Sequence, residues 1–465
     1  MKLKSLLFIL ISFSLLIIPP LQSVESSGGS TVVNYLTEVT VKLLPDKTFS
    51  AKITGSYVFI NLDTSDTIPL SNSKTVQFQQ DSTGITASND EKTFTSSTGF
   101  GIYETVIEEG NEVEISSILN NKGPVPVVYR GSFTVKPGEE SPLLFNILSM
   151  EDYLKGVVPS EMPPSWAVEN PKAIEALKAQ AVAARSYAYT QLRWKDYLEM
   201  TVASQVYGGK SKEHPLTNEA IKETDGVYAT YNNIPIDAFF HSSSGGYTEN
   251  SEDVWSSEVP YIRAVEDPYD QQPNNSHYDW SISSSVEPIQ EKLQLKENQI
   301  LLSLRITETT QGQGVQQIAA IIYDTETKAK DTINLYPELV SSADRFRSFF
   351  GFTLKSIKFT LTADSDAKVM LADGTQERVN HLLSYKVQKA DGSTVTIDGQ
   401  NVTVTSKDNT AYYPTTPSIF TFNGKGWGHA LGMSQWGARG MAEAGFTYDQ
   451  ILTYYYTGIE VKKLQ

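Results

Sequence analysis

The sequence predicts an α+β fold, a mixed, β-rich scaffold with a few helices that form a substrate cleft around a Ser160-Glu-Met-Pro turn. Short runs of β-branched and aromatic residues, separated by Gly, Asn, Asp and Pro, recur over residues 31–145 and 355–420, as expected for short strands. Two helical patterns flank the turn within residues 149–190. The chain shows no internal repeat, heptad pattern or phosphate-binding loop that would favour another architecture.

The composition is that of an ordinary globular protein. The chain has 465 residues, of which 40% are hydrophobic and 20% charged, a length that suggests about two or three domains. Its 38 Lys and Arg against 54 Asp and Glu give a net charge of −16, which argues against nucleic acid as a partner because phosphate binding needs a basic surface. The absence of Cys excludes disulfides, thiolate nucleophiles and Cys-based zinc sites, so the fold depends on its hydrophobic core.

The first 26 residues have the pattern of a secretory signal. Lys2 and Lys4 precede an apolar run over Leu6–Ile18, and a polar stretch follows. The run is shorter than the roughly 20 apolar residues that a membrane-spanning helix needs. We therefore expect an exported, extracytoplasmic protein in which residues 1–26 are a cleaved signal peptide or a retained N-terminal anchor. Membrane attachment is expected only through this segment.

Residues 31–142 are expected to form a β-rich N-terminal region. Strand-like runs occur at Val39–Leu44, Tyr57–Leu62 and Val125–Arg130. The polar segment Ser71–Asn111, rich in Ser, Thr, Gln and Asp, is typical of long hairpins or loops. No catalytic constellation is apparent in this region, which favours a scaffold or an accessory layer.

Two helices follow the β-rich region. Ser149 and Asp152, at capping-box spacing, predict the start of a short helix that ends at Gly156 and Pro159. Asn170-Pro171 predicts the start of a second, longer helix. Its buried face is marked by an apolar stripe at helical spacing, namely Ile174, Leu177, Ala181, Ala184 and Ala188.

The rest of the chain carries strand, turn and helix signals. Asp373-Gly374 and Asp391-Gly392 predict hairpin turns, and Ala343–Gly351 predicts a helix stopped by glycine. The last helix is expected to start at Thr447, with Gln450 in the capping-box position.

Glu161 lies in the turn between the first two helices. Its neighbours are apolar or small, namely Val157, Val158, Pro159, Met162, Pro163, Pro164 and Trp166. A carboxyl in such a setting is poorly solvated, and desolvation raises its pKa toward the value that a general acid needs near neutral pH. The same position suits a residue that caps the turn or lies on the surface, so spacing alone leaves both interpretations open.

Two histidines lie in polar, glycine-rich segments. A strand signal over Ile236–His241 runs into a Ser/Gly loop, and His429 lies in a segment with five glycines among the sixteen residues that end at Gly437. They could bind a metal or a sugar, or pack around a turn. A metal needs three or four ligands, and no ligand spacing supports a set with Glu249 or Asp253, so we expect none. A Ser/His/Asp triad from Ser242–Ser244 lacks a nucleophile elbow.

Four long motifs stand out in order along the chain, namely Glu151-Asp-Tyr-Leu-Lys-Gly-Val-Val-Pro-Ser-Glu-Met-Pro163, Ala176-Leu-Lys-Ala-Gln-Ala-Val-Ala-Ala-Arg-Ser-Tyr-Ala188, Phe240-His-Ser-Ser-Ser-Gly-Gly-Tyr-Thr-Glu249 and Gly426-Trp-Gly-His-Ala-Leu-Gly-Met-Ser-Gln-Trp-Gly-Ala438. Together they resemble the SpoIID/LytB family of stage II sporulation protein D and amidase-enhancer-like proteins. The resemblance covers residues 143–461, which we interpret as the catalytic region.

The resemblance implies a peptidoglycan lytic transglycosylase, with a role in sporulation or cell-wall remodelling. The family's catalytic glutamate corresponds to Glu161, which would act as general acid and then as base to leave 1,6-anhydro-MurNAc ends on MurNAc-GlcNAc strands whose stem peptides have been removed. Six further residues of the motifs are expected to bind the sugar or to orient Glu161, namely Gln180, Arg185, His241, Ser244, His429 and Gln435.

The sequence departs from the family's pattern at Lys425, Ala430 and Trp436. Some relatives are similar to zinc proteins that use Cys and His, and since this chain has no Cys we expect neither a metal nor another cofactor. The alternative is a non-catalytic, wall-binding enhancer of an N-acetylmuramoyl-L-alanine amidase. A third interpretation is a two-carboxylate muramidase, whose product would carry water at a reducing end.

Overall fold

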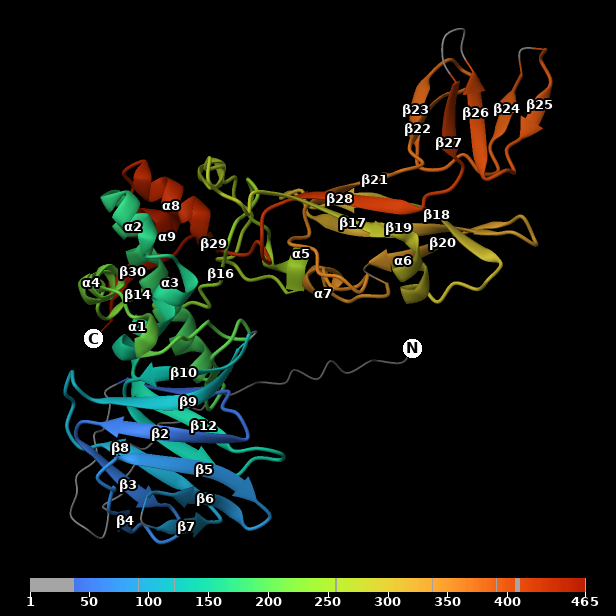
Figure 1. The fold of residues 1–465 in the computed structure, drawn as a ribbon. Helices are drawn as coiled ribbons and strands as arrows, with labels where there is room; N and C mark the ends of the chain where they lie inside the picture. Colours follow the sequence, from blue (N-terminus) through green and yellow to red (C-terminus); the bar gives the residue numbers. More distant parts are fainter. Residues whose placement is uncertain are drawn as a thin grey trace, which may run out of the picture.

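The computed structural model describes residues 37–464, apart from residues 91, 121, 256, 337, 390 and 406–409. This part of the chain is rich in strands and contains several helices, which confirms the α+β expectation at that level. Figure 1 shows a two-sheet module, a group of helices above it and an elongated arm that ends in β-hairpins. The predicted signal segment, residues 1–26, lies outside the described residues. Within those residues, no helix is long and apolar enough to cross a membrane.

Two sheets build the N-terminal module. The seven-stranded sheet has the order β13 (Leu198–Glu199), β1 (Glu38–Leu43), β12 (Leu143–Ser149), β11 (Ser132–Lys136), β8 (Phe100–Glu104), β3 (Tyr57–Asn61), β4 (Thr67–Ile68). The six-stranded sheet has the order β10 (Gly123–Tyr129), β9 (Glu112–Asn120), β2 (Thr48–Thr54), β5 (Thr75–Asp81), β6 (Gly84–Ser88), β7 (Thr93–Ser96).

The segment Ser71–Asn111 forms strands despite its polar composition. The strands β5, β6 and β7 form a meander of hairpins there, so the hairpin interpretation of this segment holds and the loop interpretation does not. Alternate residues such as Val76 and Phe78 are buried, while the intervening Gln and Thr residues face solvent. The alternation of apolar and polar residues in β5 is present in the sequence, but the polar residues of the exposed face make the segment as a whole look polar.

The helices gather around one long, central helix. They are α1 (Met150–Glu161), α2 (Ser165–Glu169), α3 (Ile174–Leu192), α4 (Pro215–Glu223), α8 (Gln435–Glu443) and α9 (Tyr448–Tyr455). α3 contacts α1, α4, α8 and α9, and beside it lies a small sheet of β15 (Ile234–Pro235), β14 (Val227–Tyr231) and β30 (Glu460–Lys463). The predicted helix starts are confirmed, with Ser149 as the N-cap of α1 and a capping box of Thr447 and Gln450 at the start of α9.

The predicted end of the first helix is wrong. Gly156 and Pro159 lie inside α1, which continues to Glu161. Gly156 serves close packing, because a Cβ at this position would lie 2.5 Å from the Tyr207 ring. The Ser160 hydroxyl donates to the Gly156 carbonyl oxygen at 2.7 Å, a local bond within the turn that contains the proline.

The arm consists of two three-stranded sheets and three hairpins. The sheets are β17 (Asp279–Ser285), β28 (Ile419–Lys425), β21 (Phe359–Ala363) and β18 (Gln299–Thr309), β19 (Val315–Asp324), β20 (Lys330–Tyr336). The hairpins are β22 (Ala367–Met370) with β23 (Gln376–Val379), β24 (Lys386–Gln388) with β25 (Thr394–Thr396), and β26 (Asn401–Thr405) with β27 (Thr410–Pro414). The first two confirm the predicted turns at Asp373-Gly374 and Asp391-Gly392.

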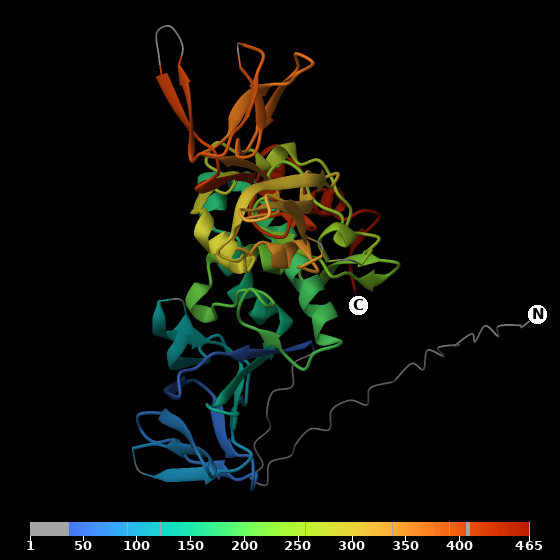
Figure 2. The ribbon, with the colours of Figure 1, turned by 90° about the vertical axis from the view of Figure 1, so that its right-hand side faces the viewer.

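Short elements complete the arm, the group of helices and the contact of α1 with the N-terminal module. They are α5 (Ser251–Trp255), α6 (Val286–Lys292), α7 (Ala343–Phe346), β16 (Phe240–His241), β29 (Met433–Ser434) and the 3₁₀ turns η1 (Pro171–Ala173), η2 (Lys210–Lys212) and η3 (Pro268–Asp270). Figure 2 shows the N-terminal module and the hairpins at opposite ends of the molecule, with the helices between them.

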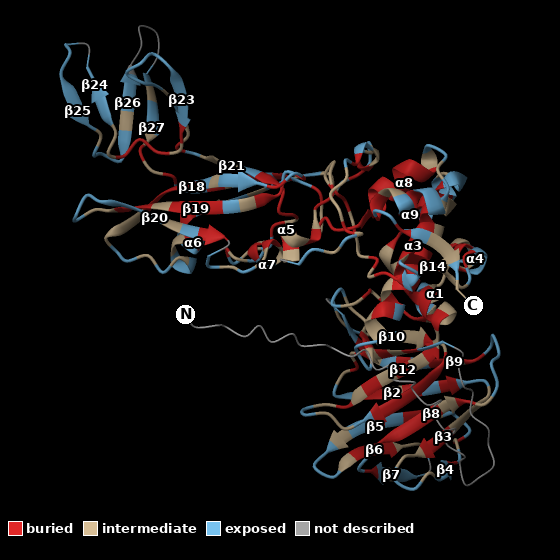
Figure 3. Cartoon of the chain, turned by 180° about the vertical axis from the view of Figure 1, so that it is seen from behind, coloured by how far each residue is buried: buried red, intermediate tan, exposed pale blue. Residues whose placement is uncertain are grey.

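One core lies in the N-terminal module and a second in the helices and the arm. α3 contributes to both, with Ala181, Ala184 and Ala188 in the first core and Ala176, Leu177 and Val182 in the second. Figure 3 shows the buried positions along α3, α8 and the inner strands, whereas the hairpins are mostly exposed. Because α3 is buried on nearly all sides, its small residues are needed to let neighbouring elements of both parts pack close to it.

Candidate active site

Glu161 is the last residue of α1 and lies where the helices meet a loop from residues 200–209. Its Oε1 accepts a hydrogen bond from the Val206 backbone N–H at 2.6 Å, and the side chain of Gln435 also donates to it. The residue as a whole is half-buried. Burial raises the pKa of the Glu161 carboxyl to about 7, and the two hydrogen bonds oppose this rise without cancelling it.

The apolar neighbours of Glu161 hold it in place. Val157, Val158 and Met162 are fully buried, and the Met162 N–H closes α1 by donating to the Val158 carbonyl oxygen at 2.9 Å. The loop opposite is fixed to the same helix, since the Gly208 N–H donates to the Gly156 carbonyl oxygen at 3.1 Å. The carboxyl is thus clamped between a helix end and a loop that are bonded to each other.

Gln435 and Gln180 extend the site from two other helices. Gln435 is the first residue of α8, whose N-cap Ser434 accepts from the Gly437 N–H at 3.1 Å. Its Nε2 donates to Oε1 of Gln180 on α3 at 3.3 Å. The Gln180 Nε2 is buried and has no partner within the described part of the chain. The structure therefore gathers Glu161, Gln435 and Gln180 into one hydrogen-bonded group.

Two tyrosines that the sequence did not single out stand beside this group. The negative charge of Glu161 contributes to raising the pKa of Tyr153 and of Tyr187, after burial as the main cause, with the pKa of Tyr187 raised to about 12. Tyr153 is fully buried and donates to Gln205 at 3.0 Å, whereas Tyr187 is half-buried. Tyr187 lies seven residues after Gln180, a spacing that could have identified it.

The two histidines lie together near the start of α8. β16 pairs in parallel with β29, which sets His241 opposite Ser434, and the His241 and His429 rings are 5.6 Å apart. His241 Nδ1 lies 3.1 Å from the Leu431 carbonyl oxygen, and His429 Nδ1 accepts from the Leu431 N–H at 3.0 Å. Burial lowers the pKa of both, that of His429 to about 4, so both are neutral at pH 7.

Ser244 belongs to a buried polar cluster that ties the Ser/Gly loop to α8. Its hydroxyl donates to Asp267 at 2.8 Å, and the hydroxyls of Ser243 and Ser434 donate to Asp270 at 2.7 and 2.8 Å. Burial raises the pKa of Asp267 to about 7 and raises that of Asp270 as well. Through Ser434, the N-cap of α8, this cluster is bonded to the start of the helix that carries Gln435.

Arg185 is fully buried and bonded elsewhere. Its Nε and Nη2 donate to the two carboxylate oxygens of Glu151 at 2.8 and 2.7 Å, and its Nη1 donates to the Val227 carbonyl oxygen at 3.1 Å. The guanidinium thereby joins α1, α3 and β14. Of the predicted site residues, the structure brings Gln180 and Gln435 to Glu161 and places Arg185, Ser244 and the histidines in separate networks.

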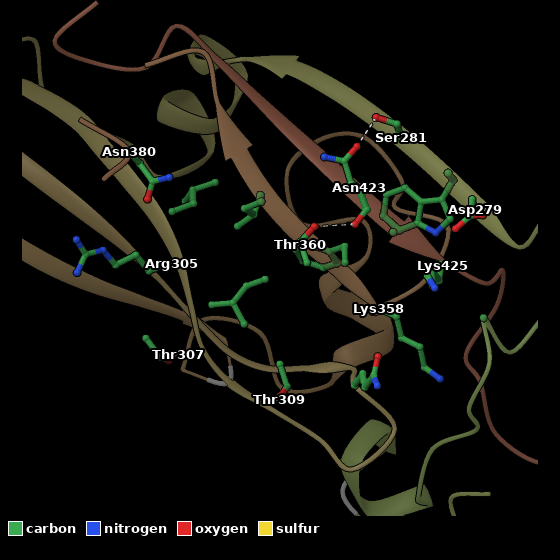
Figure 4. Close-up of a pocket in the computed structure, with 18 residues that line it drawn as sticks. Asp279, Ser281, Arg305, Thr307, Thr309, Lys358, Thr360, Asn380, Asn423 and Lys425 are labelled. Carbon is green, nitrogen blue, oxygen red and sulfur yellow. Dashed lines mark hydrogen bonds between the residues drawn. The ribbon is translucent and has the colours of Figure 1, made fainter. Parts of the chain in front are cut away.

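A cavity of about 1070 Å³ lies in the arm, between β18 and the β21–β28 sheet. Figure 4 shows polar side chains on its walls, including Thr307, Thr360 and Asn423, with Ser281 donating to Asn423 at 2.9 Å. None of the predicted site residues lines it. Among the described lining residues only Asp279 carries a carboxyl, and it is exposed.

Within the described residues, no three His, Asp or Glu side chains lie close enough together to hold a metal ion.

Comparison with known proteins finds a family match over the segment that contains Glu161. A family model described as SpoIID, Stage II sporulation protein, matches residues 139–231, which include Glu161, Gln180 and Val206. The chain is 37% identical to the amidase enhancer of Bacillus subtilis (strain 168) over 313 residues, which are 66% of this chain and 39% of that protein. It is 29% identical to the stage II sporulation protein D of the same organism over 335 residues, covering 68% of this chain and 75% of that protein.

A third relative, an uncharacterized protein of Brachyspira hyodysenteriae (strain ATCC 49526 / WA1), is 27% identical over 341 residues, which are 72% of each chain. The chain therefore spans well under half of the amidase enhancer but about three quarters of the sporulation protein.

Proposed function

Because the chain belongs to the SpoIID/LytB family, we propose that it is an exported lytic transglycosylase of peptidoglycan in which Glu161 is the acid and the base. The proposed substrates are MurNAc-GlcNAc glycan strands without stem peptides. The observation that supports this proposal is the half-buried Glu161 carboxyl, whose pKa burial raises to about 7. Burial, the Val206 amide and the Gln435 side chain act on this carboxyl, and none of them is a second carboxylate.

In the first step, protonated Glu161 donates its proton to the glycosidic oxygen while the bond from C1 of MurNAc to that oxygen breaks. With a pKa of about 7, a large fraction of Glu161 is protonated at neutral pH. The carboxylate that remains is stabilised by the hydrogen bonds that it accepts from the Val206 N–H and the Gln435 side chain.

In the second step, the Glu161 carboxylate removes the proton from the 6-hydroxyl of the same MurNAc, and O6 forms a bond to C1. The product carries a 1,6-anhydro ring, Glu161 is protonated again, and no water is consumed. One carboxyl suffices because it acts on two oxygens in succession, unlike the paired carboxyls of glycoside hydrolases.

Mass spectrometry of the products tests this proposal. The purified protein is incubated with glycan strands, with and without stem peptides, in water labelled with ¹⁸O. We expect anhydro-muramoyl ends without the label, and faster cleavage of the peptide-free strands. Reducing ends that carry ¹⁸O would instead establish a muramidase and require a second carboxyl.

Enhancement of an amidase is the second candidate function, and the name of one relative favours it. The arm offers a surface for such a partner, since its β22–β23 hairpin exposes the apolar side chains of Met370 and Leu371, at 71% and 38% exposure. Release of stem peptides by an N-acetylmuramoyl-L-alanine amidase, measured with and without this protein, separates the two functions. Stimulation that persists in Glu161→Gln would favour the enhancer.

A further inference from the structure

Trp194 is the most exposed aromatic side chain among the described residues that are large and apolar, with 83% of its surface accessible. Its backbone is nevertheless fixed, because its N–H donates to the Gln191 carbonyl oxygen at 3.0 Å in the turn that closes α3. Shortly after it, β13 pairs with β1 at the edge of the seven-stranded sheet. A large indole ring is therefore held in solvent on a well-anchored backbone.

Trp194 continues a line of side chains that begins at the candidate active site. Gln180 and Tyr187 lie seven residues apart on α3, so they project from nearly the same side of the helix, about 10 Å apart along its axis. Trp194 follows after another seven residues, in the turn just beyond the end of α3 at Leu192. Gln180 is bonded to Gln435, which donates to Glu161. Tyr187 is close enough to Glu161 for the charge to raise its pKa. Trp194 is the outermost member of this line.

The residues between these positions attach the line to the junction with the arm. The Tyr187 ring meets the Phe239 ring edge to face at 5.8 Å. Asp237 accepts hydrogen bonds from Thr190 Oγ1 at 2.6 Å and from Gln191 Nε2 at 3.0 Å. Trp194 follows three residues after Gln191, and the Arg193 guanidinium lies 5.8 Å from the centroid of its ring.

We propose that Trp194 is a sugar-binding platform for the same glycan strand that Glu161 cleaves, about two helical turns beyond Tyr187. This inference rests on the proposed function. The C–H face of a pyranose ring stacks on an aromatic ring, while its hydroxyls stay in water or reach the guanidinium of Arg193. A rigid, solvent-exposed indole suits a ligand that binds and leaves repeatedly, because little side-chain entropy is lost on contact.

The platform makes binding depend on strand length. A short oligosaccharide that fills the site at Glu161 ends before Trp194 and gains nothing from it. A longer strand reaches the indole and binds more tightly. We therefore expect truncation of Trp194 to weaken binding only of strands longer than a threshold length.

The experiment measures the dissociation constants of peptide-free glycan strands of graded length for the full protein carrying Glu161→Gln, which binds without turnover. Trp194→Ala, added to this background, should weaken binding of long strands about tenfold, as expected for one aromatic contact with its buried area, and leave short strands unchanged. Trp194→Phe should restore most of the affinity. Tyr412→Ala is the matched control, since it removes an exposed aromatic ring from β27, in the hairpins of the arm (Figure 1), and should change nothing.

Equal affinity of all strands for Trp194→Ala and its parent would overturn the platform while leaving the proposed function intact. An equal loss for short and long strands would also overturn it, because a general disturbance of the site has no length threshold. Failure of the parent protein to bind any strand would overturn the proposed function together with the platform. Thermal unfolding of Trp194→Ala at the parental temperature confirms that the variant is folded, as its 83% exposure predicts.

Discussion

At the scale of the residue, the carboxyl of Glu161 sets the pH dependence of the proposed reaction. Burial raises its pKa to about 7, so the acid form is lost as the pH rises through that value. We expect kcat to fall on the alkaline side of about pH 7. A pH–rate profile on peptide-free strands measures this, and an activity that is constant from pH 6 to pH 9 would contradict it.

The same raised pKa has a signature in stability. Between its ordinary value near 4.5 and about 7, Glu161 binds more protons in the folded than in the unfolded protein. The free energy of unfolding therefore decreases as the pH rises through this window, relative to a variant that cannot titrate. The difference between wild type and Glu161→Gln in urea unfolding should show this slope, and the comparison cancels the other buried acids such as Asp267.

Gln435 is expected to tune this pKa. Its side chain donates to Glu161 and thereby lowers the carboxyl's pKa against the larger effect of burial. Gln435→Met keeps the volume and removes the donor, so the alkaline limb of the pH–rate profile should move to higher pH. A limb that moves to lower pH, or stays in place, would show that Gln435 does not act on Glu161.

At the scale of the element, α1 and the loop at residues 200–209 act as one clamp on Glu161. Gly156→Ala places a methyl group 2.5 Å from the Tyr207 ring and 3.0 Å from the Gly209 nitrogen. The overpacking costs about 1–3 kcal/mol, which exceeds the gain of up to about 1 kcal/mol from the better helix former. We expect a lower urea midpoint together with a lower kcat. Gly110→Ala, at a position with nothing within 4 Å, is the control and should be neutral.

Elements that depend on local chemistry could be predicted from the sequence. The caps at Ser149 and Thr447 and the Asp-Gly hairpin turns need only a few adjacent residues, and they are present in the structure. The end of α1 could not be predicted, because the role of Gly156 is set by Tyr207, which lies about fifty residues later. Local signals at Gly156 and Pro159 were overridden by tertiary packing.

The candidate site likewise has features that could be predicted from the sequence and features that could not. The apolar neighbours that desolvate Glu161 are adjacent in sequence, so its raised pKa could be anticipated. The Val206 N–H is a backbone donor and leaves no signal in the identity of its residue. The pairing of Arg185 with Glu151 could not be predicted either, because the two residues lie on different helices, α3 and α1.

At the scale of the whole molecule, α3 joins the N-terminal module to the helices and the arm. Because α3 residues lie in both cores, a cavity in one core should weaken both. Leu154→Ala, in the core of the N-terminal module, should cost about 2–5 kcal/mol. The six tryptophans all lie at or after residue 166, outside that module's sheets, so their fluorescence reports on the other parts.

The tryptophan fluorescence transition of Leu154→Ala should therefore move to lower temperature together with the far-ultraviolet circular dichroism transition. Val106→Ala, at a position in the same module that is 52% exposed, should move neither. Separate transitions, with the fluorescence transition unmoved, would show that the two parts unfold independently.

In the proposed mechanism one carboxyl, that of Glu161, performs both proton transfers. The most direct measurement is the yield of anhydro-muramoyl ends from peptide-free strands treated with wild type, Glu161→Gln and the control Glu169→Gln, whose carboxylate lies on the surface and pairs with Arg439. We predict that Glu161→Gln lowers the rate by at least about a hundredfold, since general acid and base catalysis are both lost, while Glu169→Gln keeps it. Undiminished formation of anhydro ends by Glu161→Gln would show that a group other than Glu161 transfers the protons.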